Sequence, residues 1–185
     1  MKRKSYRGMS FHTFLDSAAI QARVATLGAE ITRRYEGKCP LLICVLNGAA
    51  PFALDLFRAI DTDAEISFIR LKSYEGTSST GVVKQVLGLS EDISGRDVII
   101  VEDIIDTGRT MSKLISDLDA LHPSSVAVAT LLFKPEALQC PDVKPDYVGF
   151  EIPSRFIIGY GLDIDGLARN LPDIYVLDDA DAAKA

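Results

Sequence analysis

The chain contains 185 residues, 48% of them hydrophobic, which is enough to build one domain with a substantial core. Its formal charge of −6 at pH 7 argues against general nucleic-acid binding, because that activity usually requires a basic face. We therefore expect no nucleic-acid partner, and instead small molecules or other protein subunits.

Several further classes are excluded by the residues that the sequence contains. The cysteines Cys39, Cys44 and Cys140 form an odd set without Cys-x-x-Cys spacing, and His12 and His122 are the only histidines. This pattern argues against a disulfide framework, a zinc site and a Cys/His catalytic pair, and it favours cysteines that are small core residues. No apolar signal segment or long charge-free span occurs, so we expect a cytoplasmic protein that does not contact a membrane.

The two ends of the chain are predicted to be loose. Residues 2–4 are basic and residues 178–183 are all aspartate or alanine, which is typical of frayed, solvated termini. No internal repeat, low-complexity linker or change of composition divides the sequence. We therefore predict a single domain over residues 1–185.

Helices and strands are predicted to alternate between these ends. The first helix is expected at 17–35, because Ile20, Val24, Leu27 and Ile31 recur at helical spacing on one face. The other expected helices are 51–60 and 110–121, and the expected strands are 40–46, 65–71, 82–87, 98–101, 125–133, 147–152, 156–158 and 174–177. This alternation predicts an α/β fold, a parallel twisted sheet flanked by helices, with ligands bound at the carboxyl ends of the strands.

The most informative segment covers residues 98–110. Its first four residues are apolar and β-branched without alternation, as expected for a strand buried on both faces of a parallel sheet. Glu102, Asp103 and Asp106 follow, and residues 107–110 then lead into the next helix. Backbone N–H groups and hydroxyls of this turn can converge on an anion at the helix N-terminus.

Residues 102–110, Glu-Asp-Ile-Ile-Asp-Thr-Gly-Arg-Thr, resemble the phosphoribosyl-diphosphate (PRPP) signature of the type I phosphoribosyltransferases, in the version of the hypoxanthine-guanine phosphoribosyltransferases. The resemblance implies that family's fold, with a core of about 17–135 and 174–178 and a small hood from the N-terminal segment and about 136–173. It also implies that PRPP or a nucleotide contacts Glu102, Asp103, Ile105, Asp106, Thr107, Gly108, Arg109 and Thr110. The two carboxylates at the start would hold ribose hydroxyls, directly or through Mg²⁺, while the turn wraps the 5′-phosphate.

Two loops extend the resemblance. Leu46, Asn47 and Gly48 resemble the family's pyrophosphate loop, in which the Leu46–Asn47 bond is expected in a cis-capable conformation. Many relatives have a basic residue where this chain has Asn47, so backbone N–H groups would hold the pyrophosphate here. Ser73 and Tyr74, in a polar loop between two strands, resemble the mobile lid that closes over the substrates and excludes water.

The base site is predicted from one strand end and from the hood. In the resembling enzymes, a lysine at the position of Lys134 donates to the exocyclic oxygen of a 6-oxopurine. Residues 144–163 resemble the purine-binding hood, which implies that Phe156 stacks on the purine and that Ile157 offers backbone groups to the base edge. The full set assigned to the base is Lys134, Arg155, Phe156, Ile157 and Asp163.

The resemblance implies a purine salvage enzyme that transfers 5-phosphoribosyl from PRPP to N9 of hypoxanthine, and of guanine, giving IMP or GMP and pyrophosphate. Mg²⁺ would be the cofactor, held by Glu102, Asp103 and Asp163, while Arg169 reaches the pyrophosphate. Asp106 is the expected catalytic residue, because a carboxylate near N7 can accept or share the purine proton. Carboxylates this close should raise one another's pKa unless Mg²⁺ or hydrogen bonds offset the repulsion. The family also suggests a homodimer or homotetramer.

Three alternatives remain open. A regulator on the same fold could bind PRPP or a nucleotide without turnover, but Asp106, Lys134 and Phe156 argue against it. A receiver-like signalling domain could place acidic residues at strand ends, but it would not need the Thr-Gly-Arg-Thr turn. A phosphoribosyltransferase for another base, such as xanthine, would keep the signature and change the hood.

Overall fold

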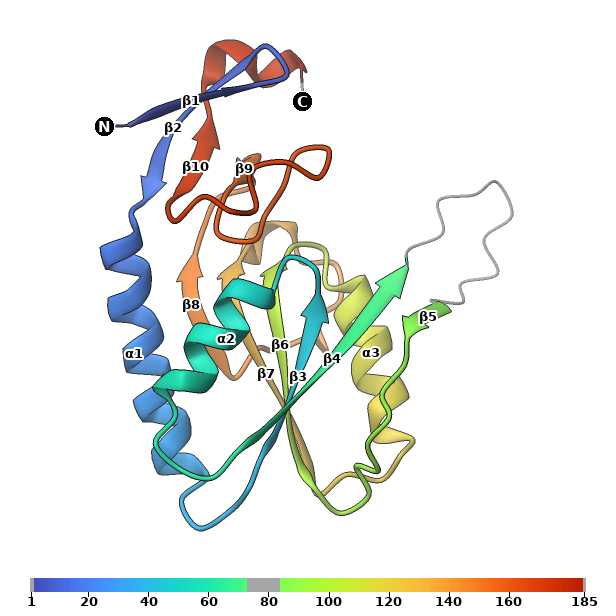
Figure 1. Ribbon diagram of the computed structural model, residues 1–185. Coiled ribbons are helices and arrows are strands. Elements are labelled where there is room, and N and C mark those ends of the chain that lie inside the picture. The colour runs from blue at the N-terminus through green and yellow to red at the C-terminus, as the bar shows by residue number, and fades with distance from the viewer. Residues whose placement is uncertain (1, 73–83, 185) are drawn as a thin grey trace.

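The computed structural model describes residues 2–72 and 84–184. Within these residues, six strands form one sheet in the order β5-β4-β3-β6-β7-β8 (Figure 1). The strands are β3 (Leu41–Leu46), β4 (Glu65–Lys72), β5 (Lys84–Leu87), β6 (Asp97–Ile105), β7 (Ser125–Phe133) and β8 (Tyr147–Glu151). All neighbouring pairs are parallel except β4 and β5. The predicted parallel α/β sheet is confirmed, with one antiparallel strand at its edge.

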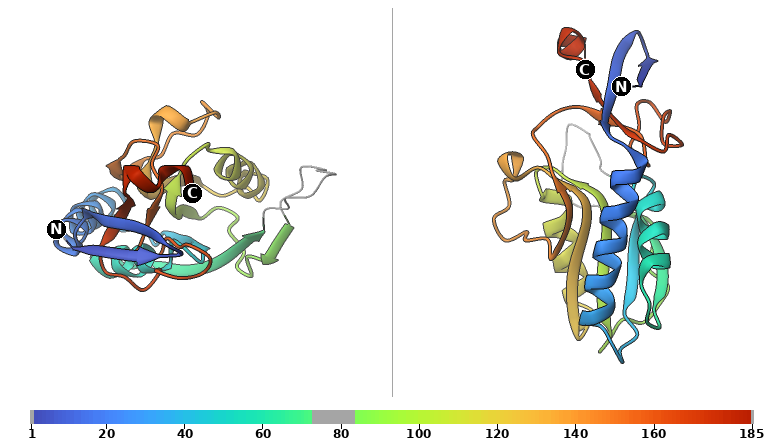
Figure 2. Two further views of the ribbon diagram at one scale, coloured as in Figure 1. Left: turned by 90° about the horizontal axis from the view of Figure 1, so that it is seen from above. Right: turned by 90° about the vertical axis from the view of Figure 1, so that its left-hand side faces the viewer.

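Helices cover both faces of this sheet (Figure 2). The helices α1 (Ser17–Arg34) and α2 (Ala50–Ala59) pack on one face, and α3 (Arg109–Asp119) packs on the other. Successive side chains of a strand point to opposite faces. Ile99 and Val101 of β6 therefore join the core cluster under α1 and α2, whereas Val98 and Ile100 join the cluster under α3. Because helices cover both faces of the sheet, the side chains on both faces of this strand are apolar.

Local signals set where the helices begin. The Asp16 side chain accepts a hydrogen bond of 2.8 Å from the Ala19 N–H and caps α1, whose buried positions include Ile20 and Val24, as predicted. Helix α3 begins one residue earlier than expected, at Arg109, directly after the left-handed residue Gly108 with φ +79°. The turn that the sequence places before this helix therefore ends in a glycine cap.

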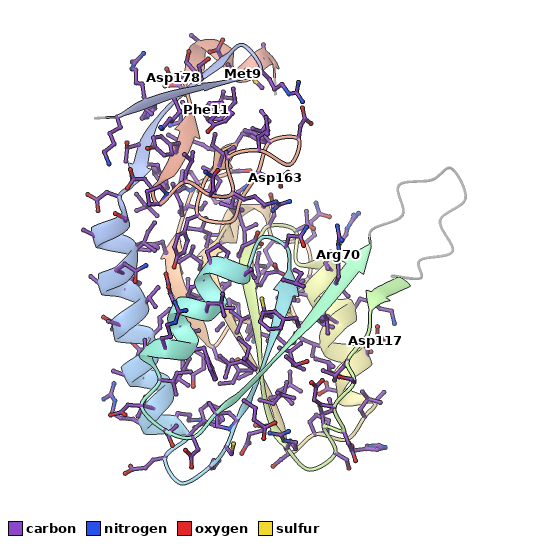
Figure 3. All side chains as sticks on the ribbon, viewed as in Figure 1. Met9, Phe11, Arg70, Asp117, Asp163 and Asp178 are labelled. Carbon is purple, nitrogen blue, oxygen red and sulfur yellow. The ribbon has the colours of Figure 1, made fainter. Side chains whose placement is uncertain are left out.

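A second, smaller sheet forms the hood over the carboxyl ends of the core strands (Figures 1 and 2). Its strands are antiparallel, in the order β1 (Arg3–Tyr6), β2 (Met9–Leu15), β10 (Ile174–Leu177) and β9 (Ile157–Ile158). Met9, Phe11 and Tyr175 belong to its own buried cluster. Figure 3 places Met9, Phe11 and Asp178 in this hood and Asp163 closer to the core.

The prediction of frayed termini is wrong. Strand β1 pairs with β2, and the Lys2 ammonium lies 3.1 Å from Oδ2 of the buried Asp173. The acidic tail forms a 3₁₀ segment, Asp179–Lys184, and the Ser10 N–H donates to Oδ2 of Asp181 at 2.8 Å. Apart from the pairing of β1 with β2, these partners come from the opposite end of the sequence, so local composition could not reveal them.

The expected division between core and hood is wrong at two strands. Strand β8 lies within the stretch assigned to the hood, but it pairs in parallel with β7 in the core sheet. Strand β10 was assigned to the core, but it pairs with β2 and β9 in the hood. A sequence pattern identifies a strand without identifying its neighbours, and both errors follow from that limit.

The three cysteines are free, and the expectation that each is a core residue holds fully only for Cys44. Cys39 is exposed, since it lies in the connection before β3, and Cys140 is partly buried. Among the described residues, no helix is long and apolar enough to cross a membrane.

Candidate functional site

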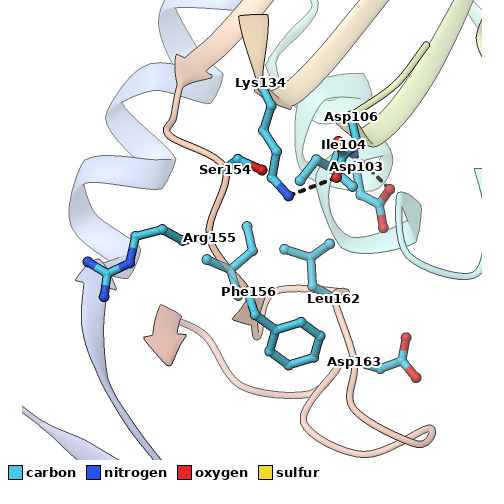
Figure 4. A pocket seen from close by; sticks show the side chains of 10 residues that line it. Asp103, Ile104, Asp106, Lys134, Ser154, Arg155, Phe156, Leu162 and Asp163 are labelled. Atoms are coloured by element: carbon cyan, nitrogen blue, oxygen red, sulfur yellow. Dashed lines mark hydrogen bonds and ion pairs between the residues drawn. The ribbon is translucent and has the colours of Figure 1, made fainter. Parts of the chain in front are cut away.

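A cavity of about 520 Å³ lies between the carboxyl ends of β6 and β7 and the hood (Figure 4). The predicted site residues that line it are Asp103, Asp106, Lys134, Arg155, Phe156, Ile157 and Asp163. The first three come from the core strands and the strand ends, and the others come from residues 155–163 of the hood. The sheet and the hood therefore bring these widely separated segments to one place.

A second pocket of about 120 Å³ lies at the N-terminus of α3. Its lining includes Glu102, Asp106, Thr107, Gly108 and Thr110. No side chain caps this helix, so N–H groups of its first turn remain available to an anion.

Arg109 and Ile105, the other two predicted residues near this turn, differ in their position relative to the pocket. Arg109 is exposed and is not among the lining residues, although it belongs to the predicted set. Ile105 has a buried side chain and lines the pocket, and its carbonyl accepts a hydrogen bond of 3.0 Å from the Lys134 N–H. The turn and the end of β7 are thus linked through the backbone.

Glu102 and Asp103 are close enough to influence each other's protonation. Burial raises the pKa of Glu102 well above its ordinary range, and the negative charge of Asp103 raises it further. Burial also raises the pKa of Asp103, although hydrogen bonds and the charge of Arg169 oppose this effect. The prediction that such carboxylates raise one another's pKa is therefore only half right: Asp103 raises the pKa of Glu102, but a hydrogen bond with Glu102 lowers the pKa of Asp103. A cation or ribose hydroxyls bound here would favour the charged forms.

The three predicted Mg²⁺ ligands do not come together. No group of three His, Cys, Asp or Glu side chains in the described part of the chain is arranged to hold a metal ion. Asp103 and Asp163 line the large cavity, whereas Glu102 lines the smaller pocket, and Oδ1 of Asp163 lies 2.7 Å from Nη2 of Arg169. Mg²⁺ typically binds through one or two carboxylates together with waters and substrate oxygens. Asp103 and Asp163, which line the same cavity, could supply such carboxylates, and the assignment of Glu102 to the metal stays a prediction.

Lys134 and Asp106 form an ion pair inside the large cavity. The Lys134 side chain is buried at the end of β7, and its Nζ lies 2.8 Å from Oδ2 of Asp106 (Figure 4). A lysine at a strand end more often extends to solvent. Here the cavity therefore presents a hydrogen-bond donor and a carboxylate side by side.

Phe156 forms an aromatic wall of the same cavity. Its side chain is 40% exposed, and the fully buried Phe11 lies behind it with ring centroids 6.2 Å apart. The Phe156 carbonyl accepts a hydrogen bond of 3.0 Å from the Leu177 N–H, which ties this wall to β10. An exposed, supported aromatic ring is suited to stacking on a planar ligand.

The predicted role of Arg155 at the base is wrong for its side chain. Its Nη2 donates to the Leu177 carbonyl at 3.1 Å and pairs with Asp179. Figure 4 shows the guanidinium pointing away from Lys134 and Phe156. Arg155 lines the cavity but uses its charge to hold the C-terminal tail.

The predicted pyrophosphate loop follows β3 directly, and the Leu46–Asn47 peptide bond is cis, as expected. A Cβ on Gly48 would lie 1.6 Å from Oδ2 of Asp103, so any side chain at this position would displace the Asp103 carboxylate. On its other side Gly48 meets the hood, because a Cβ on Gly161 would lie 1.9 Å from the Gly48 carbonyl oxygen. The predicted pyrophosphate loop, the acidic end of β6 and the hood therefore meet at Gly48.

Arg169 lies close to this meeting point. Its Nη1 donates to the Gly161 carbonyl at 2.7 Å while its Nη2 pairs with Asp163. The predicted lid residues Ser73 and Tyr74 lie outside the described residues.

Sequence reasoning missed three lining residues of the large cavity, namely Ile104, Ser154 and Leu162. Ile104 and Leu162 are sequence neighbours of Asp103 and Asp163, so adjacency could have identified them. Ser154 precedes the predicted hood residues in the same way. The hydrogen bond between Tyr160 and Asp55 had no such signal, since 105 positions separate the two residues.

The structure thus combines an α/β sheet, a pocket at a helix N-terminus, an acidic strand end and a hooded cavity with an aromatic wall. A model of the phosphoribosyl transferase domain matches residues 10–165. The chain belongs to this family.

Curated relatives and solved structures agree with this assignment. The hypoxanthine-guanine phosphoribosyltransferase of Streptococcus thermophilus is 46% identical over 159 residues, covering 85% of this chain and 88% of the relative. That of Mycobacterium avium is 46% identical over 180 residues, covering 94% and 88%. A hypoxanthine phosphoribosyltransferase structure from Staphylococcus aureus has a TM-score of 0.86 and 39% identity, covering 91% of this chain and 92% of that chain.

Other relatives are much longer. The bifunctional protein TilS/HprT of Listeria monocytogenes is 44% identical over 159 residues, which is 85% of this chain. The chain spans only about a quarter of that relative's length, 24%.

Proposed function

We propose that the protein is a hypoxanthine phosphoribosyltransferase of purine salvage, which forms IMP and pyrophosphate from hypoxanthine and PRPP and accepts guanine as a second base. One observation carries the proposal. The large cavity, with Lys134 opposite Phe156, and the anion pocket at α3 share the lining residues Ile104 and Asp106. A ligand with a base at one end and a phosphate at the other would therefore span both pockets, with its sugar beside Asp106.

The binding roles follow from the side chains. The buried Lys134 ammonium is a fixed donor for a 6-oxo group and a poor partner for a 6-amino group. Phe156 would stack on the purine, and the backbone of Ile157 would meet its edge. The turn 107–110 would hold the 5′-phosphate, and Glu102 and Asp103 would receive the ribose hydroxyls.

The reaction forms the bond between N9 of the base and C1 of the sugar and breaks the bond between C1 and the pyrophosphate oxygen. Positive charge builds on the ring and negative charge on the leaving group. Arg169 and the backbone N–H groups of residues 46–48 would stabilise that leaving group. Asp106 would accept or share the purine proton at N7 as N9 attacks. Mg²⁺, bound through Asp103 and Asp163, would neutralise pyrophosphate charge.

The direct test is a panel of bases assayed with PRPP and Mg²⁺, following nucleotide formation and pyrophosphate release. We expect turnover of hypoxanthine and guanine, no turnover of adenine or pyrimidines, and loss of activity when EDTA removes the metal. Binding of PRPP without turnover of any base would overturn the enzyme and favour a regulator. Turnover of xanthine alone would overturn the assignment of the base.

The proposal also covers the oligomeric state and the location of the protein in the cell. We expect a homodimer or homotetramer, which light scattering after gel filtration would reveal as a mass of two or four chains. A solved structure of a Trypanosoma cruzi hypoxanthine phosphoribosyl transferase has a TM-score of 0.88 and 32% identity, covering 98% of this chain and 97% of that chain. That structure addresses the role of the C-terminal region in the oligomeric state and enzymatic activity of the Trypanosoma cruzi protein. A cytoplasmic location stays a prediction from the sequence.

A further inference from the structure

A buried tyrosine joins the hood to the core at a point outside the cavities described above. Tyr160 lies in the hood segment after β9, and its Oη donates to Oδ2 of Asp55 on α2 at 2.7 Å. Gln21 of α1 donates to the same oxygen at 2.7 Å. Tyr160 is buried, and burial together with Asp55 raises the pKa of its hydroxyl, so this group stays a donor. The contact links one hood residue to two core helices.

The backbone at Tyr160 and Gly161 has positive φ angles. Tyr160 has φ +47° and Gly161 has φ +100°, a region that costs a non-glycine residue free energy and persists only where its surroundings fix it. The Tyr160 N–H donates to the Leu171 carbonyl at 2.9 Å, and the Gly161 N–H donates to the Arg169 carbonyl at 2.9 Å. The hydroxyl of Tyr160 therefore anchors a turn that the backbone alone would leave strained.

This turn sits against the pyrophosphate loop. Gly161 approaches the Gly48 carbonyl oxygen so closely that a Cβ there would lie 1.9 Å away, and the Gly161 carbonyl accepts the 2.7 Å hydrogen bond from Arg169. On the core side, α2 begins at Ala50, directly after that loop, and the Ala50 N–H donates to the Asn47 carbonyl at 3.3 Å. Asp55 thus belongs to the helix that continues from the loop.

We propose that Tyr160 and Asp55 form a latch that sets the distance between Arg169 and the pyrophosphate loop at residues 46–48. Both are positioning residues, and the inference rests on the proposed function. Asn47 carries no charge, whereas Arg169 is a cation whose place is fixed through its hydrogen bond to Gly161. Opening the latch should weaken the pyrophosphate end of the site and leave the base end, at Phe156 and Lys134, unchanged.

The test compares Tyr160→Phe with Tyr175→Phe. Tyr175 is also buried in the hood, and its hydroxyl donates to Oδ2 of Asp173 at 3.2 Å, far along the chain from the pyrophosphate loop. Each variant therefore loses one hydroxyl-to-carboxylate hydrogen bond. For Tyr160→Phe we expect the KM for PRPP, and that for pyrophosphate in the reverse reaction from IMP, to rise about threefold to tenfold, the scale of one hydrogen bond. The KM for hypoxanthine should stay within about twofold in both variants.

A second variant and a direct binding measurement make the test decisive. Asp55→Ala should reproduce the rise, and combining it with Tyr160→Phe should add little, because both changes open the same contact. Pyrophosphate binding by calorimetry should weaken in parallel. Equal changes in the KM values for PRPP and hypoxanthine, or the same changes in Tyr175→Phe, would overturn the latch. Absence of transfer by the unmodified protein would instead overturn the proposed function, which separates the two failures.

Discussion

At the scale of single residues, the ion pair between Lys134 and Asp106 is the most telling feature of the site. Each partner was predicted from the resemblance to contact a base, yet in the structure they contact each other at 2.8 Å. A base that presents an oxygen and an adjacent nitrogen to this pair can replace the contact with two of its own. In the protein without a bound base, the two side chains therefore satisfy each other.

The catalytic role of Asp106 predicts a rate effect with little binding effect. Asp106→Asn should retain PRPP binding and slow transfer by about 100-fold or more, the scale of lost acid–base assistance. The matched control is Asp117→Asn on the exposed side of α3, where Asp117 pairs with Lys113 (Figure 3). Single-turnover rates with saturating substrates measure the effect. Loss of PRPP binding with an unchanged rate per bound complex would contradict the role.

The specificity role of Lys134 predicts a different pattern. In Lys134→Met the donor for the 6-oxo group is gone and Asp106 loses its cation, so we expect the KM for hypoxanthine to rise by about tenfold or more. The KM for PRPP should change much less, because the phosphate pocket is not lined by Lys134. Steady-state kinetics with each substrate varied measures both. An unchanged KM for hypoxanthine would remove Lys134 from the base site.

At the scale of elements, the join between β6 and α3 forms the smaller pocket, where we propose that the 5′-phosphate binds. Gly108 has φ +79°, and a Cβ there would lie 2.7 Å from Cδ1 of Leu138. A side chain at this position would therefore meet both an unfavourable backbone conformation and a close neighbour. This join lies within one short stretch of sequence, which is why residue types alone could predict it.

Gly108→Ala should lower the free energy of unfolding by about 1 kcal/mol or more and weaken PRPP binding. The control is Gly95→Ala, where φ is +70° but nothing lies within 4 Å of the added Cβ, so the backbone cost remains and the clash is absent. Denaturant unfolding and PRPP titration measure the two effects. A larger loss of stability in Gly95→Ala, or unchanged PRPP binding in Gly108→Ala, would contradict this account of the join.

At the scale of the whole molecule, the two ends of the chain close the hood. Asp173 is buried and connects α1, β10 and the N-terminal residue Lys2, accepting hydrogen bonds from the Ser17 N–H at 2.9 Å, from Lys2 and from Tyr175. The Ser17 N–H is the main cause that lowers the pKa of Asp173 below its ordinary value of 3.8, and Lys2 and Tyr175 lower it further. Its charged form is therefore favoured by folding.

This lowered pKa makes part of the stability dependent on pH. A carboxylate with a lower pKa in the folded state contributes stability above its unfolded pKa, near 3.8, and loses that contribution as the pH falls through the folded value. Asp173→Asn should thus be less stable than the unmodified protein at pH 7, and the difference should shrink on acidification below pH 3.8. Asp165→Asn, at a surface pair with Arg7, is the control and should change stability little. A difference that stays constant with pH would contradict the linkage.

The sequence predicted what local chemistry decides and failed where distant segments meet. The strand β6 and the turn before α3 depend on neighbouring residues, and both were predicted. The pyrophosphate role of residues 46–48 stays a prediction. The hood sheet pairs β2 with β10, from opposite ends of the chain, and the latch pairs Tyr160 with Asp55 across 105 positions. The guanidinium of Arg155 was misplaced for the same reason, because its partner Asp179 lies in a tail that was expected to be frayed from composition.

The central claim is that one ligand spans the two pockets beside Asp106. A crystal structure of the protein with IMP tests it most directly. We predict that the phosphate lies at residues 107–110, with the hypoxanthine ring between Phe156 and Lys134. IMP bound outside these pockets, or bound with its base at the turn and its phosphate at Lys134, would contradict the account.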